Sequence, residues 1–172
     1  RLMVFHLPFL LQIVARFPRS DILMGKPLPV AAMQRFYRDR PINDFDDTRQ
    51  LQWLADTNDR LLQFVELARV IGRRVPVSIE LDIGMHRGGV GDKDALATML
   101  DTIRAYNEEL RLRGFMGYDA HVPKAPWPRT VEHASQRAKK HYAELLEFAF
   151  EGWSDLEEGD WCVNGAGSPT IS

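Results

Sequence analysis

The sequence predicts an α/β fold, a parallel (β/α)8 TIM-type barrel that is incomplete in this chain, which holds about six βα units. Short apolar runs alternate with amphipathic stretches, as in βαβ units built around a parallel sheet. Polar residues and glycines gather directly after the apolar runs, where the carboxyl ends of barrel strands form one face. No Gly-x-Gly-x-x-Gly motif follows the first apolar run, which argues against a dinucleotide-binding doubly wound sheet. An open doubly wound sheet remains the alternative, because it also brings strand ends together.

The first two βα units occupy the amino-terminal quarter of the chain. Residues 2–6 form an apolar run that predicts a strand, and Pro8 favours the start of a helix over residues 8–17. Residues 21–25 predict the second strand. Apolar side chains then recur at helical spacing over residues 29–38, which predicts the second helix.

The third unit follows a polar stretch over residues 39–48 that predicts a loop. Residues 51–55 predict a strand that ends at Asp56. Asn58 or Asp59 is expected to cap the next helix, which runs to about residue 72 because its apolar residues are spaced for burial.

The clearest strand is predicted over residues 75–83, a nearly continuous apolar run. Asp92 or Asp94 is expected to cap a helix over residues 95–110, and residues 114–121 predict the fifth strand.

The last predicted elements follow a proline-rich loop over residues 122–128. Thr130 is expected to cap a long helix that ends near residue 152, and residues 161–164 begin the sixth strand.

Composition bounds the class of protein. A chain of 172 residues with a net charge of −2 and a pI near 6.2 gives no sign of binding nucleic acid or an acidic membrane surface. The apolar run near the start is too short and too interrupted to span a bilayer. Cys162 is the only cysteine, so no internal disulfide can form, which fits the reducing cytoplasm. We therefore expect no nucleic-acid or membrane partner and a cytoplasmic location.

The first candidate site is the glycine-rich turn after the clearest strand, residues 82–90. Asp82 ends the strand, and glycines let the backbone approach a ligand closely. Arg87 is a cation in this turn, suited to a ring nitrogen, a carboxylate or a phosphate. Asp82 and Arg87 could instead pair with each other or with neighbouring loops.

Further candidates lie at the other strand ends. After the sixth strand, the Asn-Gly-Ala-Gly-Ser-Pro-Thr turn of residues 164–170 offers backbone N–H groups and hydroxyls for a phosphate, or forms an ordinary βα turn. Tyr118 could stack on a ring and His121 could exchange protons, although such a histidine is often structural. His6 could line the same mouth or cap the helix after it, and Asp56 could line the mouth or make a local ion pair.

No metal-ligand spacing is found among the histidines, and we expect His133 and His141 to be solvated. Lys26 follows a strand in a proline-stiffened loop, and we interpret it as a surface or phosphate-steering residue.

These segments, taken in order, resemble the D-threonine aldolase and D-serine dehydratase-like family. Its members are fold type III pyridoxal 5'-phosphate enzymes related to the N-terminal barrel of alanine racemase. The resemblance rests on residues 1–10, 21–29, 53–56, 80–90, 114–121 and 164–170, and so covers nearly the whole chain.

The resemblance implies a role for each candidate residue. Arg87 would face the pyridine nitrogen of the cofactor and keep it unprotonated. Tyr118 and His121 would lie near the ring or the substrate as catalytic residues. The remaining cofactor contacts would come from the phosphate turn and the barrel mouth: Gly165, Gly167, Ser168, Thr170, Asp56 and His6.

The resemblance also implies parts outside residues 1–172. Both ends of the chain look cut, so these residues are expected to be a partial barrel domain. The first strand, with the lysine that binds the cofactor covalently, would precede Arg1, and Lys26 does not match that lysine. A C-terminal β-domain with a divalent metal would follow Ser172. The fragment alone is expected to be inactive, and the full-length protein is expected to be a homodimer.

The activity implied is a metal-assisted lyase reaction, aldol cleavage or dehydration, on a D-β-hydroxy amino acid. The alternatives are an amino-acid racemase and a non-catalytic barrel that binds pyridoxal phosphate in cofactor homeostasis. The long loops over residues 39–48 and 122–129 favour an enzyme that handles a substrate. A metal-dependent or phosphosugar barrel would need a carboxylate or histidine cluster, which we do not find.

Overall fold

A computed structural model describes residues 1–124, 130–156 and 161–165 of the chain. Its strands are β1 (Leu2–Val4), β2 (Ile22–Met24), β3 (Leu51–Ala55), β4 (Val75–Leu81), β5 (Leu110–Gly117) and β6 (Cys162–Asn164). Its α-helices are α1 (Leu7–Arg16), α2 (Val30–Asp39), α3 (Asp47–Gln50), α4 (Asn58–Ile71), α5 (Lys93–Ala105) and α6 (Val131–Gly152). Two short 3₁₀ helices cover η1 (Val122–Lys124) and η2 (Ser154–Leu156).

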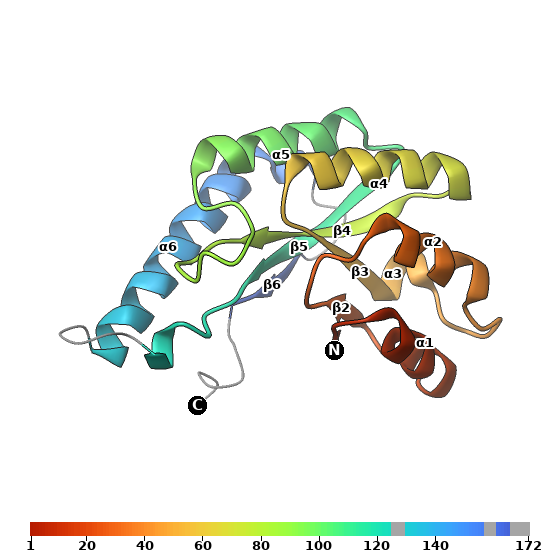
Figure 1. Ribbon diagram of the computed structural model, residues 1–172. Helices are drawn as coiled ribbons and strands as arrows, with labels where there is room; N and C mark the ends of the chain where they lie inside the picture. The colour runs from red at the N-terminus through yellow and green to blue at the C-terminus, as the bar shows by residue number, and fades with distance from the viewer. Residues whose placement is uncertain (125–129, 157–160, 166–172) are drawn as a thin grey trace.

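The six strands form one parallel sheet in the order β1-β2-β3-β4-β5-β6, which is their order in the chain. A doubly wound sheet would reverse its order at a switch point, and this sheet does not. The sheet curls, with the helices along its outer side (Figure 1). The side chain of Arg1, beside β1, donates a hydrogen bond to Cys162 on β6, the last strand of the order. The chain is therefore a curled half-barrel, and the predicted incomplete TIM-type barrel is confirmed.

The apolar core lies between the outer face of the sheet and the helices. All seven residues of β4 are buried, as a strand covered on both faces requires. Trp53 of β3 packs edge-on against Phe36 of α2, with 5.6 Å between the ring centroids. Phe115 of β5 packs in the same way against Phe150 of α6, at 6.3 Å.

The inner face of the sheet carries polar side chains, because alternate residues of a strand point to opposite sides. Ser78 of β4 donates a hydrogen bond of 2.9 Å to Gln52 of β3, and both side chains are buried. Glu80 follows two residues later on the same face and is also buried. This polar row leads along β4 to the carboxyl ends of the strands.

The elements after β4 differ from their predicted bounds. α5 ends at Ala105 and β5 begins at Leu110, so the predicted helix over residues 95–110 is too long and the predicted strand over 114–121 starts too late. Leu110 and Leu112 are buried and alternate with partly exposed arginines, a strand pattern that the prediction missed. Gly117 ends the strand before Tyr118.

Helix caps and one loop also differ from the prediction. Thr57 caps α4 by accepting from the backbone of Arg60, so the predicted caps at Asn58 or Asp59 are wrong. A threonine hydroxyl one residue earlier reaches the free N–H groups of the first turn. Asp92 and Thr130 cap α5 and α6, as predicted. The predicted loop over residues 39–48 ends in the single turn of α3.

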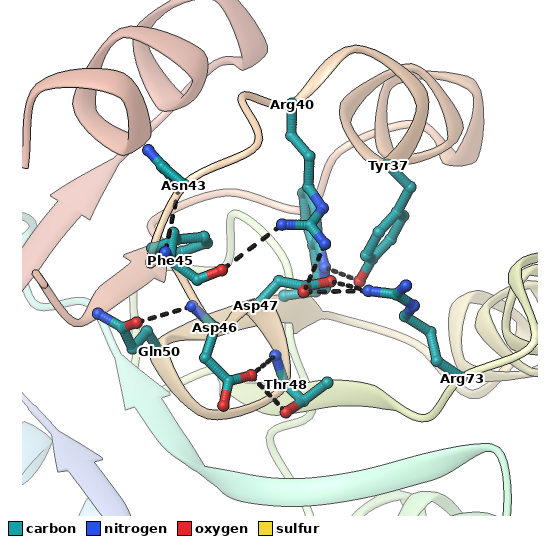
Figure 2. Close-up of polar contacts among 10 residues, drawn as sticks. Tyr37, Arg40, Asn43, Phe45, Asp46, Asp47, Thr48, Gln50 and Arg73 are labelled. Atoms are coloured by element: carbon teal, nitrogen blue, oxygen red, sulfur yellow. Dashed lines mark hydrogen bonds and ion pairs between the residues drawn. The ribbon is translucent and has the colours of Figure 1, made fainter. Parts of the chain in front are cut away.

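Asp47 forms a buried ion cluster at the amino ends of the strands (Figure 2). Its side chain is 4% exposed and lies 3.1 Å from Arg73 Nη1 and 3.4 Å from Arg40 Nη2. Beside it, Trp53 Nε1 donates to the Tyr37 hydroxyl at 2.9 Å, and burial raises the pKa of Tyr37. The cluster ties α2, α3 and the start of β4 together at the end of the barrel opposite the candidate site.

Candidate functional site

The loop between β4 and α5 is held at both ends by the sheet. Asp82 N–H donates to the Val90 carbonyl at 2.9 Å, and Val90 N–H donates to the Glu80 carbonyl at 3.0 Å, so the loop returns to its own strand. Gly89 has a φ of 89°, and a Cβ there would lie 2.6 Å from the Glu80 carbonyl oxygen. Only glycine allows this return, which fixes the position of residues 83–88.

Asp82 organises the first half of this loop. Its carboxylate accepts hydrogen bonds from the backbone N–H groups of Gly84 and His86 at 3.0 and 2.9 Å. The ring Nδ1 of His86 lies 2.8 Å from the same carboxylate. These bonds hold His86 at a φ of 54°, a left-handed conformation that costs a non-glycine residue free energy.

Burial alone would raise the pKa of Asp82, but the bonds from His86 and Gly84 outweigh it and lower that pKa below its ordinary value. A carboxyl group whose pKa is lowered by folding stabilises the protein at pH values above its ordinary pKa, near 4. This stabilisation is lost as the pH falls through the lowered pKa.

Replacing Asp82 by asparagine is therefore expected to destabilise the protein by about 1 kcal/mol at neutral pH, since charge-assisted hydrogen bonds become neutral ones. The difference from the original protein should shrink as the pH is lowered below about 4. Urea unfolding at pH 7 and at pH 3 measures both effects. Asp44→Asn, at an exposed loop position, makes the same chemical change and should be neutral at both pH values. An Asp82→Asn effect that is equal at the two pH values would contradict the role of the charge.

Arg87 is fixed between an acid and an aromatic ring. Its Nη2 lies 2.6 Å from Glu80 Oε1, and the Glu80 side chain is 4% exposed. The guanidinium stands over the ring of Tyr118, 4.7 Å from the centroid, in a cation–π contact. The suggested pairing of Asp82 with Arg87 is wrong, because Glu80 pairs with Arg87 and Asp82 with His86.

Burial raises the pKa of Glu80 above its ordinary value, while the hydrogen bond from Arg87 lowers it in part. The charges of Asp56 and Asp82 add to the increase. Asp56 also faces this centre from the end of β3, because a Cβ on Gly88 would lie 3.7 Å from its Oδ2. Arg87 therefore lies in a group of three carboxylates at the carboxyl ends of β3 and β4.

His121 packs against the opposite side of the loop. Its Nε2 would lie 3.0 Å from a Cβ placed on Gly84. Its Nδ1 is buried and has no hydrogen-bond partner in residues 1–124, 130–156 and 161–165. A buried polar atom without a partner requires an explanation, such as a ligand or a residue beyond the described part.

The other predicted site residues lie at separate places. His6 caps α1, with its Nδ1 accepting from the Phe9 N–H at 3.2 Å, so its suggested capping role is confirmed. Gly165 directly follows β6, and a Cβ there would lie 2.8 Å from the ring of Tyr142. The predicted phosphate contacts at Gly167, Ser168 and Thr170 lie outside the described residues.

Sequence analysis missed two residues that position the site. Glu80 was visible as an acid inside an otherwise apolar strand, two residues before Asp82 and on the same face. Tyr142 of α6 donates a hydrogen bond of 3.0 Å to the Asn164 carbonyl and so fixes the end of β6 before Gly165. Burial raises the pKa of Tyr142 well above its ordinary value. No local pattern marked Tyr142, because its partner lies 22 residues away.

Two further findings bear on the kind of site. In the described part of the chain, no three His, Cys, Asp or Glu side chains are arranged to hold a metal ion. None of the described helices combines the length and the apolar character needed to cross a lipid bilayer.

Comparison with known proteins gives one family and many similar folds. A family profile described as "Alanine racemase, N-terminal domain" matches residues 11–170. An alanine racemase of Clostridium difficile 630 superposes with a TM-score of 0.72 at 12% identity, over 96% of this chain and 40% of that one. The D-threo-3-hydroxyaspartate dehydratase of Delftia sp. HT23 gives 0.71 at 18% identity, over 87% and 38%. The alanine racemase of Bacillus anthracis, with bound L-Ala-P, gives 0.65 at 20% identity, over 88% and 35%.

The chain thus spans about two fifths of the length of the solved structures it resembles. At these identities the likeness shows the fold alone. Comparison with curated proteins finds no match.

Proposed function

Because this chain belongs to the family of the alanine racemase N-terminal domain, whose members are enzymes that use pyridoxal phosphate, we propose that its parent protein is a pyridoxal-phosphate-dependent lyase. The proposed substrates are D-β-hydroxy amino acids, and the reaction is aldol cleavage or dehydration. The observation that carries the proposal is Arg87, held by Glu80 and Tyr118 at the carboxyl ends of the strands. The dehydratase from Delftia, which acts on D-threo-3-hydroxyaspartate by its name, supports the substrate class.

The residues present fit the cofactor. A planar guanidinium keeps several N–H donors after it has bonded Glu80 through Nη2 alone, so Arg87 can donate to a ring nitrogen. The unpartnered Nδ1 of His121, in the segment after β5, offers a second polar group beside this loop. Gly165 brings a backbone N–H to the end of β6, where the phosphate turn begins.

Pyridoxal phosphate, when bound, withdraws electrons from the α-carbon of an amino acid and so weakens the bonds around that carbon. Arg87 would act as a fixed donor to the ring nitrogen, held by its ion pair with Glu80 and its cation–π contact with Tyr118. His121 has the role of proton acceptor, at Nδ1, for the β-hydroxyl proton or the α-proton. Tyr118 lies near the ring or the substrate.

The phosphate is proposed to bind at Gly165, Gly167, Ser168 and Thr170, where backbone N–H groups and hydroxyls alternate. Asp56 is proposed to line the mouth beside Arg87. His6 is a weaker cofactor contact, because its Nδ1 already accepts from Phe9 in the cap of α1.

The remaining parts of the reaction are proposed for the parent protein. A strand outside residues 1–172 would supply the covalent lysine, and a further β-domain would supply a divalent metal, whose chemistry would be to polarise the β-hydroxyl. The parent is proposed to be a cytoplasmic homodimer.

The proposal is tested on the purified parent protein. We expect a yellow protein whose visible absorbance disappears on treatment with borohydride, and release of aldehyde, keto acid or ammonia from D-threonine, D-serine or D-threo-3-hydroxyaspartate. Activity should depend on added divalent metal, and the L-amino acids should not react. A colourless protein that takes up no pyridoxal phosphate would overturn the proposal.

An amino-acid racemase is the second candidate, favoured by the superposition on two alanine racemases. The two reactions differ in what leaves the α-carbon. A racemase in deuterated water exchanges the α-hydrogen of alanine and forms its mirror image, whereas the proposed lyase breaks down the hydroxy amino acid and leaves alanine unchanged.

A further inference from the structure

A pocket of about 900 Å³ lies between the β4–α5 loop and the amino-terminal half of α6. The loop lines it from Asp82 to His86, and His121 and Lys124 line it from the segment after β5. Neither Arg87 nor Tyr118 lines the pocket. The pocket therefore does not include the Arg87–Glu80 ion pair, although it borders the candidate site through His121.

One face of α6 gives this pocket a basic wall. Arg137, Lys140 and His141 line it, at spacings of three and four residues that place them on one side of the helix. Arg137 and Lys140 are like charges one turn apart, and both are exposed at the rim of the pocket. These side chains lie at the pocket and not on the opposite face of α6, where Lys139 is exposed.

The two acids of the pocket are already engaged. Asp82 accepts two backbone N–H groups and the His86 ring, and Glu144 pairs with Lys140 at 3.8 Å. Within the described residues, Lys124 and Arg137 have no ion-pair partner. The pocket thus presents cations from two elements, and its own carboxylates do not neutralise these.

The rest of the lining is apolar. Ile83 and Met85 come from the loop, and Ala134 and Ala138 come from α6. The small alanine side chains leave room between the helix and the loop, and Ala138 is buried. A ligand would therefore contact apolar side chains inside the pocket and cations at its rim. Small-molecule sites commonly combine an apolar lining with a few polar groups in this way.

We propose that this pocket binds a small molecule that carries a carboxylate or phosphate group on a short apolar skeleton. Lys124 and Arg137 hold the anionic group, the arginine through paired N–H donors. The skeleton lies against Ile83, Met85, Ala134 and Ala138. The pocket shares His121 and the β4–α5 loop with the candidate site, but anion binding by Lys124 and Arg137 requires no cofactor.

Isothermal titration calorimetry on the whole protein tests the proposal with two probes, succinate and inorganic phosphate. We expect saturable binding of at least one probe, unchanged whether pyridoxal phosphate is present or removed. Tighter binding of succinate assigns the pocket to carboxylates, and tighter binding of phosphate assigns it to phosphorylated molecules.

Single substitutions locate the binding. Arg137→Gln and Lys124→Gln should each weaken it roughly tenfold or more, because each removes a charge-assisted hydrogen bond. Lys139→Gln removes the same charge from the same helix outside the pocket and should leave the affinity unchanged, as should Arg87→Gln. Thermal unfolding of the unliganded variants checks that each is folded.

Loss of binding in Arg87→Gln, with no change in the two pocket variants, would overturn the proposal by assigning the anion to the cofactor mouth. Equal weakening by Lys139→Gln and Arg137→Gln would overturn it by showing non-specific attraction to α6. The absence of saturable binding of both probes would also overturn it. None of these binding experiments measures turnover, so a negative result would overturn the pocket proposal without bearing on the lyase proposal.

Discussion

Replacing Arg87 by glutamine in the parent protein is expected to lower kcat/KM for a D-β-hydroxy amino acid by about a hundredfold or more. Loss of one preorganised donor at a reacting group has an effect of this size. The substitution also removes the partner of a buried carboxylate, since Glu80 lies 2.6 Å from Arg87 and its side chain is 4% exposed. The visible spectrum of the bound cofactor should shift as well, because its ring nitrogen loses a cationic neighbour.

A second readout separates this role from a loss of fold. Arg87 lowers the pKa of Glu80, which burial raises, so the pKa should rise further in Arg87→Gln. When folding raises the pKa of a carboxyl group, the folded protein loses stability as the pH increases from the group's ordinary pKa to its raised pKa. The variant should therefore lose more stability than the original protein over this range. Carbon-13 NMR of labelled glutamate follows the titration directly.

Arg35→Gln is the matched control, because Arg35 is 65% exposed and, among the residues that the structure describes, pairs only with Asp39 on the surface of α2. It should change neither turnover nor the titration of Glu80. Full activity in Arg87→Gln would remove Arg87 from the cofactor site and leave it as a structural partner of Glu80.

Replacing Asp47 by alanine is expected to destabilise the protein by about 3 kcal/mol, the largest effect on stability that we predict. Removal of one partner from a buried ion cluster leaves the opposite charges without compensation. Here Arg40 and Arg73 would face each other across the empty position, and the link between α3 and the start of β4 would be lost. Chemical denaturation at neutral pH measures the change.

Asp44→Ala is the control for this prediction, because Asp44 is exposed in the same loop. Its effect should stay within about 0.5 kcal/mol, as for most surface substitutions. If both variants lose the same stability, the arginines relax into water and the cluster contributes little. Cofactor binding should be unaffected in either case, since Asp47 lies at the amino ends of the strands.

The fold could be predicted because apolar periodicity and glycine positions repeat along the chain. Strand β4 and the Asp92 and Thr130 caps are local features, and they occur where their patterns predict. The boundary between α5 and β5 was missed because a turn at Tyr106 joins two apolar patterns of different period. Leu110 fits both patterns, and only its pairing with Val75 decides between them.

The candidate site was less accessible to sequence reasoning. Arg87 and Tyr118 could be named from their places at strand ends, but their contact depends on the register of β4 and β5. The pairing of Arg87 with Glu80 depends on the loop returning to its own strand. His141, expected to be solvated, is partly buried and lines the pocket beside α6, since the path of α6 relative to the loop is set by long-range packing.

The return of the β4–α5 loop to its own strand has a consequence for the evolution of this protein's sequence. Val90 and Glu80 form the closing bonds through backbone atoms, so they depend little on the side chains between them. Gly89 must stay, and Arg87 and His86 are tied to Glu80 and Asp82, but Met85 and Gly88 can accept new residues without breaking these contacts. Mutation can therefore explore new specificities in this short stretch while the scaffold stays intact.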